Sequence, residues 1–168
     1  MVAVCLALLM IASPIWPLGE NPSYGDPFII VNVATNELAY INDGSLQEIL
    51  PVASGKEGDR TPTGFFSVVV KAKNPYYRKL DIQGGDVHNP LGTRWIGFDA
   101  RGTDGRIYGI HGTNRPDSIG SHVTAGCIRL PNEVVEKLYE DIPLGTKLYI
   151  TDEVDASFEE LAKKAGAM

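Results

Sequence analysis

The chain has 168 residues, of which 43% are hydrophobic, and its formal net charge at pH 7 is −6. This hydrophobic content supports a packed core and argues against a largely disordered chain. No segment collects lysine and arginine, so nucleic acid is not expected as a partner, because phosphate binding requires a basic stripe.

Residues 1–18 are nearly all apolar and predict a signal peptide or a membrane anchor. This segment is expected to contact the membrane at least during export, which would place the protein in the cell envelope, outside the cytoplasmic membrane, either secreted or anchored. No lysine or arginine precedes the apolar run, and the small-residue site Ala12-Ser13 is followed by Pro14, so cleavage is left open. Residues 19–27 are predicted to form a linker.

From Phe28 onward the chain is a series of short β-type runs separated by turn residues. Residues 28–53 predict a meander of three strands, with a hairpin turn at Asp43-Gly44. Further strands are predicted at 64–71, 94–98, 106–110 and 147–151. The polar segment 72–93 is long for a loop in a compact domain, and such loops are usually functional. The pattern predicts one mostly-β domain over residues 28–152.

Two short helices are also predicted. Asn132 is expected to cap a helix over residues 133–141, which Pro143 ends. The C-terminal segment 153–168 contains Ser157-Phe158-Glu159-Glu160, a capping-box pattern that predicts a short helix to about Ala165. Phe158, Leu161 and Ala165 would then face the core.

Cysteine usage leaves one candidate nucleophile. Cys5 lies in the apolar N-terminal segment, so the domain contains a single thiol, Cys127, and no internal disulfide. A lone thiol in an exported protein is a candidate reactive group, although free cysteines are also often buried and inert. Cys127 precedes the predicted helix, and Arg129 follows two residues later. Both are expected to lower the pKa of the thiol below its usual value of about 8.5.

His111 is the candidate base for this thiol. It ends a predicted strand sixteen residues before Cys127, and the loop between them is long enough to bring imidazole and thiol together. A nucleophile with a base is what acyl transfer through a thioester requires. Gly126 lets a substrate approach the backbone, and amides around Cys127 would face a developing oxyanion. Surface histidines and arginines are common, however, so these residues alone leave the function open.

The order of the motifs adds a further argument. The chain contains a His-Gly-Thr start, a Ser-Ile-Gly loop and a Thr-x-Gly-Cys-Ile-Arg ending, preceded by Thr-Pro-x-Gly-x-Phe and Asn-Pro-Leu-Gly segments. They stand at residues 111–113, 118–120, 124–129, 61–66 and 89–92. This series resembles the catalytic signature of the L,D-transpeptidase family (the YkuD-type domain). One departure is Ala125, where many members have histidine.

The resemblance implies a β-sandwich with one or two short helices, in which loop 72–93 partly covers a cleft holding Cys127. The implied substrate is a peptidoglycan stem peptide. Cys127 would attack the carbonyl before the fourth-position D-alanine, with His111 as base. An amine of a neighbouring stem would complete a 3→3 cross-link, and a wall-attached acceptor is an alternative. Water as the acceptor would make the enzyme an L,D-carboxypeptidase.

The resemblance also assigns the surrounding residues. Gly126 and Cys127 would supply backbone donors, and Arg129 would orient the site or meet a substrate carboxylate. Gly112 and Thr124 belong to the same expected oxyanion and substrate-binding set. No metal or organic cofactor is implied.

Two alternatives remain at this stage. The first is a zinc site formed by His111, His122 and Cys127, although their spacing fits no compact metal motif. The second is a wall-binding domain without catalytic activity. Of the two histidines nearest Cys127 in sequence, His111 is preferred as the base, because a predicted strand supports it while His122 lies in a predicted turn.

Overall fold

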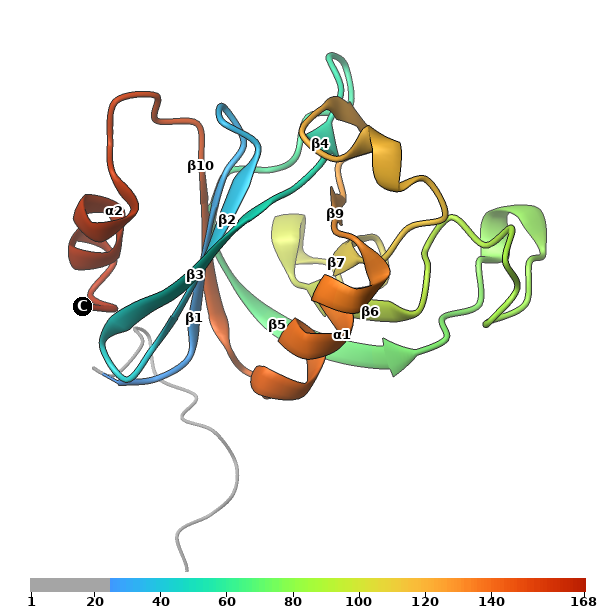
Figure 1. Cartoon of the computed structure of the whole chain (residues 1–168), viewed down its shortest axis with the longest axis horizontal. Coiled ribbons are helices and arrows are strands. Elements are labelled where there is room, and N and C mark those ends of the chain that lie inside the picture. The colour runs from blue at the N-terminus through green and yellow to red at the C-terminus, as the bar shows by residue number, and fades with distance from the viewer. Residues whose placement is uncertain (1–24) are drawn as a thin grey trace, which may run out of the picture.

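The computed structural model describes residues 25–168, so the predicted export segment (1–18) and most of the predicted linker lie outside the described residues. In the described part, eight strands form one sheet in the order β3-β2-β1-β10-β5-β6-β7-β9, and β4 pairs with β8 separately (Figure 1). The strands are β1 Phe28–Asn32, β2 Glu37–Asn42, β3 Ser45–Pro51, β4 Ser54–Gly55, β5 Gly64–Lys73, β6 Arg94–Phe98, β7 Tyr108–His111, β8 His122–Thr124, β9 Ile128–Arg129 and β10 Lys147–Thr151. The predicted mostly-β fold is confirmed.

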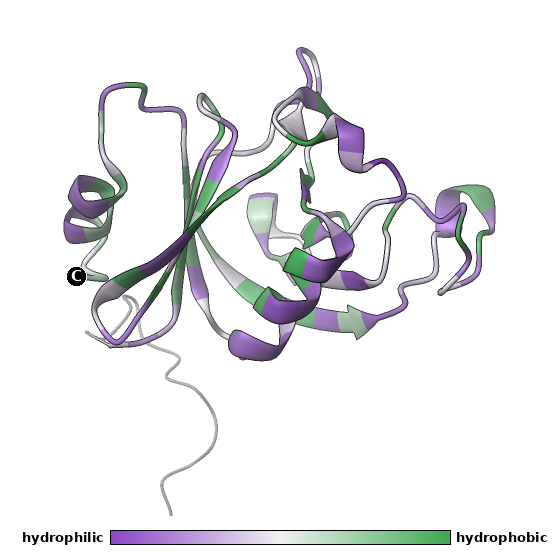
Figure 2. Cartoon of the chain, viewed as in Figure 1, coloured by the Kyte–Doolittle hydropathy of each residue, from purple (hydrophilic) through white to green (hydrophobic). Residues whose placement is uncertain are grey.

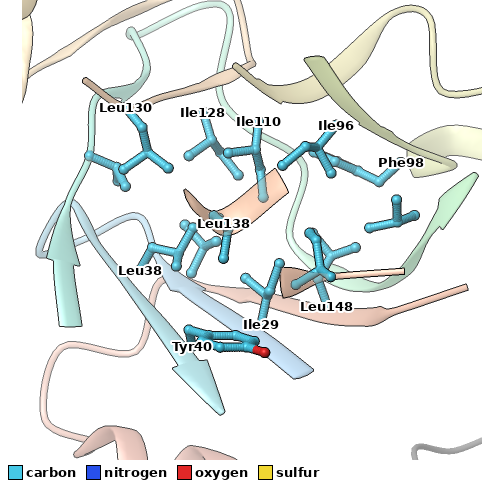
Figure 3. Close-up of a cluster of buried hydrophobic side chains, with 14 of the residues drawn as sticks. Ile29, Leu38, Tyr40, Ile96, Phe98, Ile110, Ile128, Leu130, Leu138 and Leu148 are labelled. Carbon is cyan, nitrogen blue, oxygen red and sulfur yellow. The ribbon is translucent and has the colours of Figure 1, made fainter. Parts of the chain in front are cut away.

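The sheet changes partner along β5. The first part of β5 pairs with β10, and its second part, from Val68 to Lys73, pairs with β6. A register shift lies between Val68 and Val70 in this second pairing. The sheet therefore curls, and β1, β2, β3 and β10 face β6, β7 and β9 across a common core (Figure 3). Side chains from both halves fill this core, including Ile29, Leu38, Ile96, Ile110, Ile128 and Leu148. This is the sandwich-like packing that was predicted.

Helix α2 (Phe158–Lys164) covers the other face of β1 and β2. Its Phe158 and Leu161 pack with Phe28 and Ile30, and its hydrophilic residues face outward (Figure 2). Because both faces of β1 are covered, all five of its residues are buried, without the alternation typical of a half-exposed strand. The predicted capping box at Ser157 is present.

Helix α1 (Asn132–Asp141) packs Val135 and Leu138 into the central core. The prediction that Asn132 caps this helix is wrong, since Pro131 occupies the N-cap position and makes no side-chain cap bond. The Asn132 Oδ1 instead accepts hydrogen bonds from the amides of Thr93 (3.2 Å) and Thr113 (3.0 Å). The side chain therefore joins the helix start to two loops. No helix in residues 25–168 combines the length and apolar character needed to cross a membrane.

Most strand boundaries agree with the sequence, and the hairpin at Asp43-Gly44 is confirmed by positive φ angles of 50° and 66°. The strand predicted at 106–110 instead spans Tyr108–His111. The Asp104 carboxylate accepts from the Arg106 amide at 3.2 Å, and this local bond favours a turn there. Strand β5 extends to Lys73, so the long loop covers 74–93 and contains the 3-10 turn Arg78–Leu80. Two further 3-10 turns span Ala100–Gly102 and Pro116–Ser118.

Candidate active site

Strands β7 and β9 bring the predicted nucleophile and base onto one face of neighbouring segments. They pair in parallel, with Ile110 opposite Ile128 and His111 opposite Arg129, and Cys127 directly precedes β9. Ile110 and Ile128 are fully buried in the core. Because side chains alternate along a strand, His111 and Arg129 point to the opposite face, and adjacent strands lie only about 4.8 Å apart. Cys127, two residues before Arg129, continues the same face.

His111 is held as a neutral imidazole. Its side chain is buried (4% exposed), and its Nδ1 lies 2.5 Å from the Gly112 carbonyl. A carbonyl can only accept, so Nδ1 carries the proton and Nε2 keeps a free lone pair. Burial, with the nearby Arg129 charge, lowers the pKa of His111 from 6.5 to about 4, although the Gly112 bond opposes this shift. His111 is therefore ready to accept a proton at neutral pH.

Trp95 fixes the plane of the imidazole. The two residues face each other on β6 and β7, and their rings stack with centroids 5.7 Å apart at 16°. The indole Nε1 donates to the Gly105 carbonyl at 2.8 Å. Gly109 makes room for the indole, because a Cβ there would lie 2.6 Å from a Trp95 ring carbon. The contact between Trp95 and His111 was not predicted from the sequence. A glycine within a strand, such as Gly109, often marks such a close approach.

Cys127 is partly exposed, and its Sγ donates to the Ile107 carbonyl at 3.4 Å. The protein atoms packed around the thiol raise its pKa from 9.0 to about 11, while a hydrogen bond from the Gly109 backbone and the charge of Arg129 oppose this rise. The predicted lowering of the thiol pKa is therefore wrong in net direction. Arg129 acts as predicted, but burial dominates. Helix α1 begins only after β9, and a helix dipole acts mainly within its first turn.

The loop that carries the nucleophile is ordered by Thr124. Its Oγ1 donates to the Cys127 carbonyl at 2.6 Å and accepts from the Gly126 amide at 3.2 Å. Thr124 is buried (4% exposed), so it acts on the site through the loop backbone. Gly126 has φ +104°, which favours glycine, and its amide is already engaged. Within residues 25–168 the Cys127 amide makes no hydrogen bond, so it is the donor available to an oxyanion.

Gly112 anchors the site rather than lining it. Its carbonyl holds His111, and a Cβ at this position would lie 2.1 Å from the Asn132 Oδ1. A Cβ at Gly92 would also lie 2.1 Å from that oxygen. The Asn132 side chain therefore fixes the backbone next to Gly92 and next to Gly112. This contribution was not predicted, because it depends on three segments that are distant in sequence.

Arg129 supplies a cation beside the thiol. Its Nη1 donates to Ser118 Oγ at 2.8 Å, and its Nε is buried without a partner among the described residues. Burial and the positive charge of Arg115 both lower the pKa of Arg129. Two neighbouring guanidinium groups form an arrangement suited to a carboxylate. This role was predicted for Arg129, whereas no role at the site was predicted for the side chains of Arg115 and Ser118.

His122 is bound away from the nucleophile. Its Nε2 donates to the Val33 carbonyl at 2.7 Å, and its Nδ1 accepts from Asn36 Nδ2 at 3.2 Å. Both ring nitrogens are thus used, and His122 cannot join His111 and Cys127 as a zinc ligand in this arrangement. No group of three His, Cys, Asp or Glu side chains suited to a metal occurs in the described residues.

Loop 74–93 is attached next to His111, the predicted base. Asn114 Nδ2 donates to the His88 carbonyl at 2.9 Å, and the Thr93 amide donates to Asn132. A pocket of about 540 Å³ lies along the turn 55–61 and His122, and loop 74–93 contributes none of its lining. The cleft over Cys127 that the family resemblance implies stays a prediction.

Comparison with known proteins identifies the family. The L,D-transpeptidase catalytic domain (YkuD) family matches residues 26–150. YqjB of Bacillus subtilis (strain 168), which is named for the L,D-transpeptidases, is 60% identical over 156 residues, covering 93% of this chain and 88% of that protein. The chain therefore belongs to the L,D-transpeptidase family, as its motifs predicted.

Solved structures show the same fold. The NMR structure of the catalytic domain of the Enterococcus faecium L,D-transpeptidase is 25% identical, with a TM-score of 0.58, covering 77% of this chain and 99% of that domain. L,D-transpeptidase 3 from Mycobacterium tuberculosis, in complex with a faropenem-derived adduct, is 17% identical, with a TM-score of 0.61. This match covers 74% of the present chain but only 60% of the mycobacterial one, so part of that protein has no counterpart here.

Proposed function

We propose that this protein is a cysteine-dependent L,D-transpeptidase that acts on peptidoglycan stem peptides. It releases the fourth-position D-alanine and forms 3→3 cross-links through a thioester on Cys127. The observation that carries the proposal is the neutral His111, whose Nδ1 is fixed on Gly112 and whose strand lies next to the nucleophile.

The first half-reaction uses the resting thiol. With a thiol pKa of about 11 and an imidazole pKa of about 4, both groups are uncharged at neutral pH. Cys127 turns from the Ile107 carbonyl toward His111, and its proton passes to Nε2 as sulfur attacks the carbonyl before D-alanine. The oxyanion accepts from the Cys127 amide, an interaction that contributes roughly 3 kcal/mol in comparable sites. His111 then gives its proton to the departing D-alanine nitrogen.

The second half-reaction transfers the acyl group. An amine on the third residue of a neighbouring stem attacks the thioester carbonyl and gives a proton to His111. The carbon–sulfur bond breaks, the amide of the cross-link forms, and the proton returns to the Cys127 sulfur. Arg129, with Arg115 beside it, holds a carboxylate of the substrate while this occurs.

The test is mass spectrometry of muropeptides incubated with the purified protein. Cross-linked dimers joined through their third residues, together with free D-alanine, are expected with the natural chain and absent with Cys127→Ala. Tripeptides without cross-linked dimers would show that the protein is a carboxypeptidase rather than a transpeptidase. Unchanged muropeptides would refute the proposal.

We also propose that the enzyme works outside the cytoplasmic membrane. The apolar segment 1–18 supports this location, which is where a cell-wall substrate lies. A reporter that is active only after export, fused behind Tyr24, is expected to be active. Activity of a cytoplasm-specific reporter at the same position would overturn the location.

A further inference from the structure

A mixed-charge pocket lies beside the catalytic loop. It measures about 540 Å³, within the range of small-ligand sites, and is lined by Val33, Ala34, Gly55, Glu57, Arg60, Thr61, His122 and Asp152. The proposed chemistry uses none of these side chains. His122 forms part of the wall, and its ring is held by Asn36 and the Val33 carbonyl.

The three charged side chains of the pocket are unpaired. Among residues 25–168, no ion pair or hydrogen bond engages the carboxylates of Glu57 and Asp152 or the guanidinium of Arg60. Their neighbours Lys56 and Asp59, by contrast, pair with each other at 3.4 Å. Charges of both signs thus face one cavity without neutralising each other. A ligand that carries both an ammonium and a carboxylate fits this arrangement.

The pocket shares a wall with the nucleophile loop. The Lys56 amide donates to the Thr124 carbonyl at 3.0 Å, and the Arg60 carbonyl lies 3.7 Å from the position of a Cβ on Gly126. Standard backbone dimensions then place this carbonyl within roughly 9 Å of the Cys127 Cα. A side chain of three methylenes reaches roughly 5 Å from its Cα. A residue bound covalently at Cys127 can therefore place the end of a long side chain at this pocket.

We infer that the pocket recognises the side-chain end of the third stem residue, in the form of a diamino acid whose terminal carbon bears both an amine and a carboxylate. This inference rests on the proposed function, which brings that residue to Cys127. Arg60 binds the carboxylate, and Glu57 and Asp152 bind the ammonium. Lysine at the same position ends in an ammonium alone and leaves Arg60 facing a like charge. The pocket thereby selects the diamino acid of the stem.

Binding to the Cys127→Ala protein tests the inference without turnover. Two tetrapeptides are compared by calorimetry, one with the amine-and-carboxylate side chain at its third position and one with lysine. The first is expected to bind at least tenfold more tightly. Arg60→Gln is expected to remove most of this preference, whereas Lys163→Gln on α2, which removes an equal charge far along the chain, preserves it. The side chains of Arg60 and Lys163 are exposed, so both substitutions leave the core untouched.

Equal affinity for the two peptides, or a preference that survives Arg60→Gln, would overturn the inference. A combined Glu57→Gln and Asp152→Asn change should weaken both peptides, since both carry the ammonium. Failure of the natural chain to release D-alanine would instead refute the proposed function, and the binding comparison would still decide the role of the pocket.

Discussion

Acidification offers a direct test of the buried histidine. The imidazole of His111 is enclosed, stacked on Trp95 and placed near Arg129, and these surroundings disfavour its charged form. Its pKa in the folded protein is about 4, compared with 6.5 for an unperturbed histidine. Between these pH values the unfolded chain binds more protons at this site than the folded one.

The sign and size of the effect follow from that difference. The stabilisation is fully present above pH 6.5, decreases as the pH falls, and is exhausted near pH 4, where the folded protein also binds the proton. A shift of one pKa unit corresponds to 1.36 kcal/mol, so the free energy of unfolding should fall by about 3 kcal/mol across this window. His111→Gln, which cannot titrate, should lack this component.

Urea unfolding at intervals from pH 7.5 to pH 4 would measure both proteins. The difference between the two pH profiles isolates His111, because every other titratable group is present in both proteins. Proton NMR of the imidazole would give its pKa directly. A pKa for His111 above 6.5, as a resting thiolate–imidazolium pair would produce, would refute the argument, as would equal pH slopes in the two proteins.

Further predictions concern the reaction and its support. Cys127→Ser should retain the fold but lose nearly all transfer, because a hydroxyl gives no accessible anion to a weak base; more than a few per cent activity in the D-alanine assay would place the nucleophile elsewhere. A carbapenem should add once per chain by intact mass, and not to Cys127→Ala; no adduct after prolonged incubation would count against a thioester mechanism. His111→Ala should lower the acylation rate by at least two orders of magnitude and His122→Ala by less than tenfold, so equal deficits would contradict the assignment of the base. Asn132→Ala should cost about 1–3 kcal/mol in urea unfolding, because two amides lose their acceptor, while Asn132→Asp, which keeps the oxygen, should cost less; similar losses in both variants would remove this role.

Burial and Arg129 have different effects on the charges of Cys127 and His111. Arg129 favours the thiolate, but it also disfavours a charged His111, so one cation acts on both partners. The neutral pair that results requires proton transfer during attack rather than before it. Substrate that excludes water and presents its carbonyl to the Cys127 amide would favour that transfer in the complex.

Much of the fold, and the family, were determined by the sequence alone. The alternation and turn residues placed the meander from Phe28, the strand Arg94–Phe98 and the capping box at Ser157, because each depends on residues near one another in the chain. The ordered motifs around His111 and Cys127 likewise identified the family.

Only the tertiary structure decided how those residues are supported and charged. The pKa of the thiol depends on the atoms packed around Cys127 from β7 and its preceding turn, and local sequence contains no measure of that burial. Asn132 has the sequence pattern of a cap, yet its oxygen is used by the amides of Thr93 and Thr113. The stacking of Trp95 on His111 likewise follows from strand register. Desolvation and long-range hydrogen bonds arise only when distant segments meet, so no local pattern encodes them.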